Sequence, residues 1–127
     1  MRNLLILAFL AFVSVSNAQI YVNKVNINDR DLQYVEVWEK YDNDKKRFMG
    51  LLDYGQYDDR KNDKDGKMLR ITNEEGLAIE FNGIVHVLNF MYRNGWEVMH
   101  VKAVDNYESF IMKRKDPFEI QISGSEN

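Results

Sequence analysis

Cysteine is absent from this chain of 127 residues. The chain therefore forms no disulfide, has no thiolate nucleophile and offers no sulfur ligand to a metal. A chain of this length can nevertheless fold around one hydrophobic core without covalent cross-links. The fold must then come from the apolar pattern and the turns.

Histidine is also scarce, and acidic residues slightly outnumber basic ones. His86 and His100 are the two histidines, and they do not form the His-x-x-x-His spacing typical of zinc sites. Lys and Arg number 17 against 20 Asp and Glu, a net charge of −3, which argues against a basic nucleic-acid-binding face. The chain has no phosphate-binding loop, dinucleotide fingerprint or nucleophile elbow. No catalytic residue or cofactor is predicted.

The first 18 residues have the three regions of a signal peptide. One positive charge at Arg2 precedes an apolar run from Leu4 to Val15, and Ser16 and Ala18 are small residues at the cleavage site. The run is too short to cross about 30 Å of hydrocarbon. We therefore predict cleavage after Ala18 and a soluble exported protein, periplasmic or extracellular, with no membrane span in the mature chain.

The mature chain is predicted to be one α+β domain at 19–116, followed by a C-terminal tail at 117–127. β-rich composition and alternation predict strands, and polar or glycine-containing segments predict the turns between them. Strands are expected at 32–41, 48–57 and 68–72, with a short return at 77–81, and 20–28 is expected to be a short strand or an arm. Residues 58–67, almost wholly charged or polar, are expected to be a solvated loop.

Residues 82–94 carry the one helical period. The predicted apolar stripe has the i, i+3, i+4, i+7 spacing and consists of Phe81, Ile84, Val85, Leu88, Met91 and Tyr92. Asn82 is the predicted N-cap, and Gly95 suits the left-handed position after the helix. Trp96 would then pack against Met91, and Gly95→Ala is expected to cost more stability than Trp96→Phe.

Residues 96–104 and 107–115 alternate around Asp105-Asn106 and predict a hairpin with a two-residue turn. The expected cross-strand pairs are Val101–Phe110, Met99–Met112 and Glu97–Arg114. This register places Met99, Val101, Ala103, Phe110 and Met112 on one apolar face. The other face holds Trp96, Val98, His100, Tyr107 and Ile111, mixed with Lys102, Ser109 and Lys113.

The predicted order is therefore β-β-β-α-β-β. It describes an antiparallel sheet of about four to six strands with one main helix packed on one face.

The chain also resembles a family. Residues 87–101, with a helix ending in Gly-Trp-Glu, and the hairpin strand at 107–115 look like small bacterial domains of unknown function. Over about residues 20–115, the motifs at 34–37, 53–56 and 74–76 are similar to small exported proteins of Bacteroides-type bacteria. The resemblance implies the fold and export but no activity, so it transfers no catalytic residue. The charged insert at 58–67 departs from the family pattern.

The sequence gives less support to two further sites, a calcium loop and a glycoside-hydrolase carboxylate pair. Asp63, Asp65 and Gly66 resemble part of a calcium loop, with Asp58 and Asp59 nearby, but Lys61 and Thr72 replace two strong ligands. Carboxylates on predicted strands offer a glycoside-hydrolase pair, and these are Glu36, Glu39, Glu80 and Glu97.

One helix covers only one face of a sheet, so aromatic residues on the other face predict an interaction surface. Alternatively, the N-terminal arm or the tail covers these aromatic residues. The candidate surface consists of Tyr34, Trp38, Trp96, Val98, His100, Tyr107 and Ile111. We expect a non-enzymatic binding module for an unknown protein or envelope component, with a homodimer compatible with the sequence. The alternative is a small hydrolase acting on the envelope or on glycans.

Overall fold

The computed structural model describes residues 18–56 and 69–115 and confirms an α+β fold with antiparallel pairing. Its main sheet has five strands in the order β6-β4-β3-β8-β7. Their bounds are β3 Tyr34–Asp42, β4 Arg47–Asp53, β6 Glu80–Phe81, β7 Trp96–Val104 and β8 Tyr107–Arg114. The predicted strand pair at 32–41 and 48–57 is therefore present, with its bounds shifted by a few residues.

A second sheet of three very short strands closes one end of the core. Its order is β2-β1-β5, with bounds β1 Tyr21–Val22, β2 Val25–Asn26 and β5 Ile71–Thr72. A 3₁₀ turn, η1, follows at Ile27–Asp29. Residues 20–28 are thus an ordered arm that pairs with β5, and the sequence did not predict this separate sheet.

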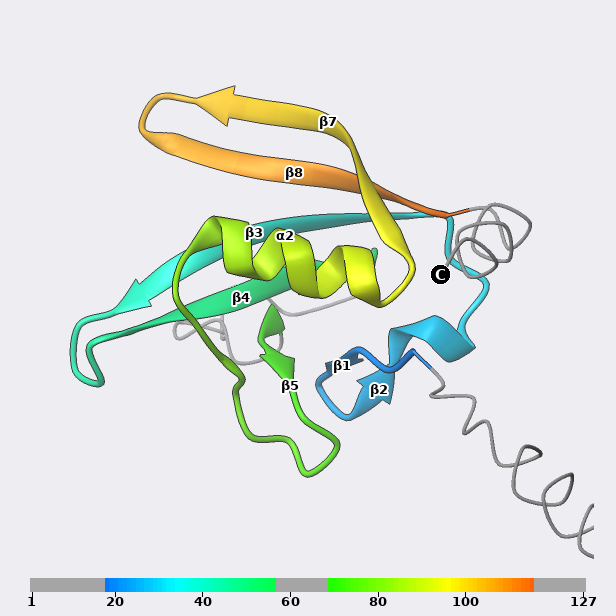
Figure 1. The fold of residues 1–127 in the computed structure, drawn as a ribbon, viewed down its shortest axis with the longest axis horizontal. Helices are drawn as coiled ribbons and strands as arrows, with labels where there is room; N and C mark the ends of the chain where they lie inside the picture. The colour runs from blue at the N-terminus through cyan, green and yellow to red at the C-terminus, as the bar shows by residue number, and fades with distance from the viewer. Residues whose placement is uncertain (1–17, 57–68, 116–127) are drawn as a thin grey trace, which may run out of the picture.

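The helix, α2, runs from Ile84 to Arg93. Figure 1 shows it lying in front of β3 and β4, with the β7–β8 hairpin on one side and β1, β2 and β5 on the other. Its end was predicted correctly, because Gly95 has a φ of 95° and donates its N–H to the Tyr92 carbonyl. The N-cap prediction was wrong. Gly83 is the N-cap and makes no side-chain cap bond, while the Asn82 N–H donates to His86 Nδ1.

The buried face of α2 is rotated from the predicted stripe. Val87 and Met91 are fully buried, whereas Val85 and Tyr92 are exposed. The spacing 84, 87, 88, 91 fits a helical period as well as the predicted one, because the helix is apolar on more than one side. Partly buried side chains complete the contact, and these are Ile84, Leu88 and Phe90.

The β7–β8 hairpin keeps the predicted register only near its turn. Val101 faces Phe110 as expected, and Val104 faces Tyr107 across the two-residue turn. A β-bulge between Val98 and His100 then shifts the register by one residue. The Met99–Met112 and Glu97–Arg114 pairs were therefore predicted wrongly. Val98 faces Met112, and Glu97 faces Lys113.

The main sheet has two distinct faces, because directly opposed residues lie on the same side. We call the side packed on α2 the helix face. Its central residues share one core cluster with α2, and they are Val35, Val37, Leu52, Met112 and Trp96. We call the opposite side the far face. It carries Tyr34, Glu36 and Trp38 of β3, with Tyr107, Ser109 and Ile111 of β8 and His100 and Lys102 of β7.

Candidate functional site

The far face brings together five of the seven predicted surface residues. Glu36 of β3 faces Ile111 of β8, which in turn faces His100 of β7. Tyr34 and Trp38 lie on the same side of β3, two residues either way from Glu36. The five residues that share this face are Tyr34, Trp38, His100, Tyr107 and Ile111.

Trp96 was predicted for this surface wrongly, since it is fully buried. The bulge places it opposite Arg114 on the helix face. Its indole Nε1–H donates to Asn28 Oδ1 at 2.8 Å, and the Arg114 guanidinium lies 5.0 Å from the ring centroid. The N-terminal arm therefore contacts Trp96 through Asn28, on the helix face and not on the far face.

Val98 was assigned to this surface wrongly as well. It faces Met112, so the bulge moves it to the helix-face side of β7. Alternation along a strand assigns faces correctly only while the period of two is unbroken, and the bulge breaks it at Met99. Val98 remains exposed there.

A polar cluster around the single carboxylate of Glu36 lies at the centre of the far face. Glu36 Oε1 accepts a hydrogen bond of 2.6 Å from Ser109 Oγ and one of 3.2 Å from Lys102 Nζ. Ser109 is buried, while Lys102 is about half exposed. The sequence pattern places Glu36 between Tyr34 and Trp38, yet the prediction of the surface left it out. This cluster fixes a polar centre between the aromatic rings.

The aromatic part of the far face centres on Trp38 and Tyr107. Their ring centroids lie 6.4 Å apart in an edge-to-face arrangement. Tyr107 is 45% exposed and Tyr34 is 52% exposed. Burial, and then the negative charge of Glu36, raise the pKa of the Tyr107 phenol above its usual value. Like an ordinary tyrosine, Tyr107 keeps its hydroxyl proton at neutral pH and can donate a hydrogen bond to a partner.

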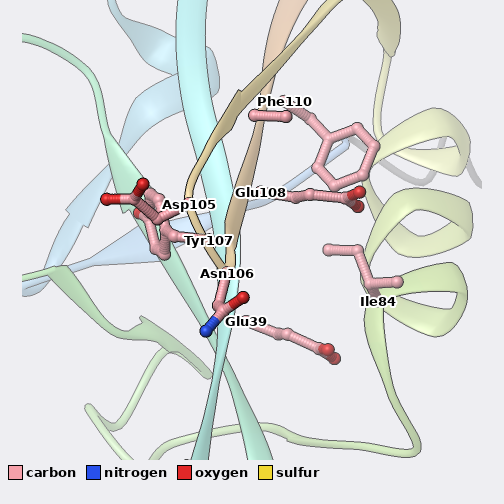
Figure 2. A pocket seen from close by; sticks show the side chains of 8 residues that line it. Glu39, Ile84, Asp105, Asn106, Tyr107, Glu108 and Phe110 are labelled. Atoms are coloured by element: carbon pink, nitrogen blue, oxygen red, sulfur yellow. The ribbon is translucent and has the colours of Figure 1, made fainter.

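A hollow of about 350 Å³ lies between the tip of the β7–β8 hairpin and the start of α2. Figure 2 shows Glu39, Glu108 and Phe110 pointing to the side of Ile84 at the start of α2, while Asp105 and Tyr107 point away. Glu39 Oε2 is buried and makes no hydrogen bond. It lies 3.8 Å from the position that a Cβ at Gly83 would take. A carboxylate there complements the helix N-terminus, which has no acidic residue of its own in the first turn.

The four predicted carboxylates do not converge. Glu39 is on the helix face, and Glu36 is bound by Ser109 and Lys102 on the far face. Glu80 Oε1 is 2.7 Å from Arg47 Nη1. Glu97 faces Lys113. The pair that shares a hollow is instead Glu39 with Glu108, which sequence reasoning missed because their proximity depends on how β3 lies against the hairpin.

Neither metal option gains support from the described residues. His86 packs edge-to-face on Phe81 at 5.1 Å, and His100 is exposed on the far face. Residues 18–56 and 69–115 contain no group of three or more His, Asp or Glu that could hold a metal ion. The calcium alternative at Asp58, Asp59, Asp63 and Asp65 falls outside the described residues.

Comparisons with known proteins give no match. No family model, curated protein or solved structure matches this chain. The resemblance to small exported bacterial domains therefore stays a prediction. Within the described part of the chain, no helix has the length and apolar character needed to span a membrane.

Proposed function

We propose that this protein is an exported, non-enzymatic binding module whose far face docks a protein or another envelope component. The observation that carries the proposal is the pair of exposed rings beside a fixed polar centre. Tyr107 and Tyr34 are about half exposed, and Trp38 packs against Tyr107. Rigid aromatic side chains near hydrogen-bonded polar groups are the usual anchors of protein interfaces.

Export rests on the pattern of residues 1–18, which predicts a signal peptide. It is also consistent with the implied family of small exported bacterial domains. An exported module of this kind meets its partner in the periplasm or outside the cell. The surface therefore has to be tested against envelope material.

The chain offers a closely matched control for this test. Tyr107 and Tyr41 are both 45% exposed, and each makes one edge-to-face contact, Tyr107 with Trp38 and Tyr41 with Phe48. Tyr107 is on the far face, whereas Tyr41 is on the side of Phe48 and Phe81. Replacing either by Ala removes the same ring, so only its position differs.

The experiment captures components of a solubilised envelope extract on immobilised residues 19–127 and measures the affinity of each captured component. Tyr107→Ala and Trp38→Ala are expected to weaken binding about 10-fold or more, because buried aromatic anchors dominate interface energy. Tyr41→Ala is expected to bind like the wild type. Equal binding by all variants contradicts the proposal.

The hydrolase alternative is favoured by one observation, that Glu39 and Glu108 line the same hollow. It makes a different prediction in the same assay. A captured glycan would be cleaved, and Glu39→Gln or Glu108→Gln would abolish cleavage without reducing capture. Capture without cleavage supports the binding module.

A further inference from the structure

Strand β7 is an edge strand of the main sheet. It pairs with β8 on one side, and no described strand pairs with its other side. It is nine residues long, and Val98, Met99 and Val101 are each about half exposed. A long edge with apolar side chains and open backbone groups is a template for another strand.

The register identifies which backbone groups of β7 point outward. The Lys115 N–H donates to the Gly95 carbonyl, while the Arg114 N–H donates to Gln33 beside β3. The backbone groups of odd-numbered β8 residues therefore point toward β7. The β7 residues opposite them are Glu97, His100, Lys102 and Val104. The backbone groups of Val98 and Val101 consequently point away from β8.

The bulge makes this edge selective. Outward-pointing residues recur every second residue along a regular strand. Because of the bulge at Met99, Val98 and Val101 are three residues apart. If a regular strand pairs with Val101, its inward-pointing backbone groups do not lie opposite the outward-pointing groups of Val98. A second copy of β7, antiparallel about a two-fold axis, has the same spacing, so Val98 meets Val101 of the second copy and Val101 meets its Val98.

The charges of β7 are complementary in this same register. It places Glu97 opposite Lys102 of the second copy, and the two-fold axis repeats the pair. Both residues are on the far face, since Glu97 faces Lys113 and Lys102 faces Ser109. The side chain of Lys102 is 48% exposed beside Glu36, so it can reach a second carboxylate. Cross-strand pairs of opposite charge stabilise an antiparallel ladder.

We propose that β7 pairs antiparallel with β7 of a second copy, with Val98 opposite Val101 and Glu97 opposite Lys102. The two five-stranded sheets then form one continuous sheet across a symmetric edge. Each valine pair exchanges two backbone hydrogen bonds, as in any bonded antiparallel pair. The inference is independent of what the far face binds.

Charge reversal tests the register with residues 19–127. Glu97→Lys and Lys102→Glu each place like charges opposite one another twice, so each variant alone is expected to dissociate at concentrations where the wild type is dimeric. Mixing the two variants restores opposite charges at both contacts. In the mixed dimer, both lysines of one variant lie opposite the two glutamates of the other. The mixture and the double variant Glu97→Lys/Lys102→Glu are both expected to dimerise, as light scattering across a concentration series would show.

Matched controls separate this contact from general charge effects. Glu108→Lys and Lys40→Glu make the same changes at exposed positions on β8 and β3 and are expected to leave dimerisation unchanged. A wild type that stays monomeric up to about 1 mM overturns the proposal. So does a dimer that both single reversals leave intact.

Hydrogen exchange of the wild type gives a second readout if Lys102→Glu, which places a new carboxylate beside Glu36, does not fold. The Val98 and Val101 amides point into solvent in one copy and are expected to gain protection as the concentration rises. Unchanged exchange at both amides in a dimeric sample contradicts the proposed edge.

Discussion

Trp96 joins three parts of the chain through one side chain. It is fully buried in the core, its indole N–H is bonded to Asn28 of the arm, and Arg114 of β8 lies over its ring. Arg114 Nη2 also donates to the carbonyls of Ile27 and Asn28. Trp96 therefore couples the arm to the hairpin as well as filling the core.

This environment reverses the order of stability effects expected from the sequence. Trp96→Phe removes core volume and leaves Asn28 Oδ1 without its donor, an expected loss of about 2–3 kcal/mol in the free energy of unfolding. Gly95→Ala strains a φ of 95°, but no atom lies within 4 Å of the added Cβ, so about 1 kcal/mol is expected. Urea titration of both variants would measure the order, and a larger loss for Gly95→Ala would contradict this account.

One carboxylate accepts hydrogen bonds within the β3–β4 turn. Asp42 Oδ1 accepts hydrogen bonds from the backbone N–H groups of Asp44 and Lys45, at 3.0 and 3.2 Å. The Lys45 N–H is the main reason that the pKa of Asp42 is lowered, with further contributions from the Asp44 N–H and from the charges of Lys45 and Arg47. The ionised carboxylate thus holds the turn in place.

The sign of the pH effect follows from that lowered pKa. The contribution of Asp42 is complete above the unfolded-state pKa of about 3.9 and is lost as pH falls through the lower folded-state value. Asp42→Asn keeps a side-chain acceptor but removes the ionisation. Melting temperatures measured from pH 6 down to pH 2 should therefore fall less steeply for Asp42→Asn than for the wild type, and identical slopes would exclude this role for Asp42.

At the level of elements, the sequence predicted the helix end and the hairpin turn because local chemistry determines both. Gly95 supplies the left-handed residue that the helix end requires, and a two-residue turn fits Asp105-Asn106. The sequence did not predict the bulge at Met99, because alternation continues to look regular on each side of it. That single residue accounts for the wrong placement of both Trp96 and Val98.

At the level of the whole molecule, the α+β class followed from the helical period at 82–94 between segments of strand composition. The small sheet did not, because strands of two residues such as β1 and β5 are too short to show a period. The grouping of Tyr34, Trp38 and Tyr107 was predictable from strand parity. The Glu39–Glu108 hollow was not, because it depends on packing between elements distant in sequence.

The two tryptophans of the chain lie on opposite sides of the main sheet, with Trp96 sealed in the core and Trp38 on the far face. Indole emission depends on the polarity of its surroundings, so the two rings report different events. In a Trp38→Phe variant, the remaining fluorescence follows the folding of the core and the docking of the arm. In a Trp96→Phe variant, it follows the surroundings of the far face and would report a partner that docks there as proposed. The fold therefore supplies separate intrinsic optical probes for the core and for the far face, without any added label.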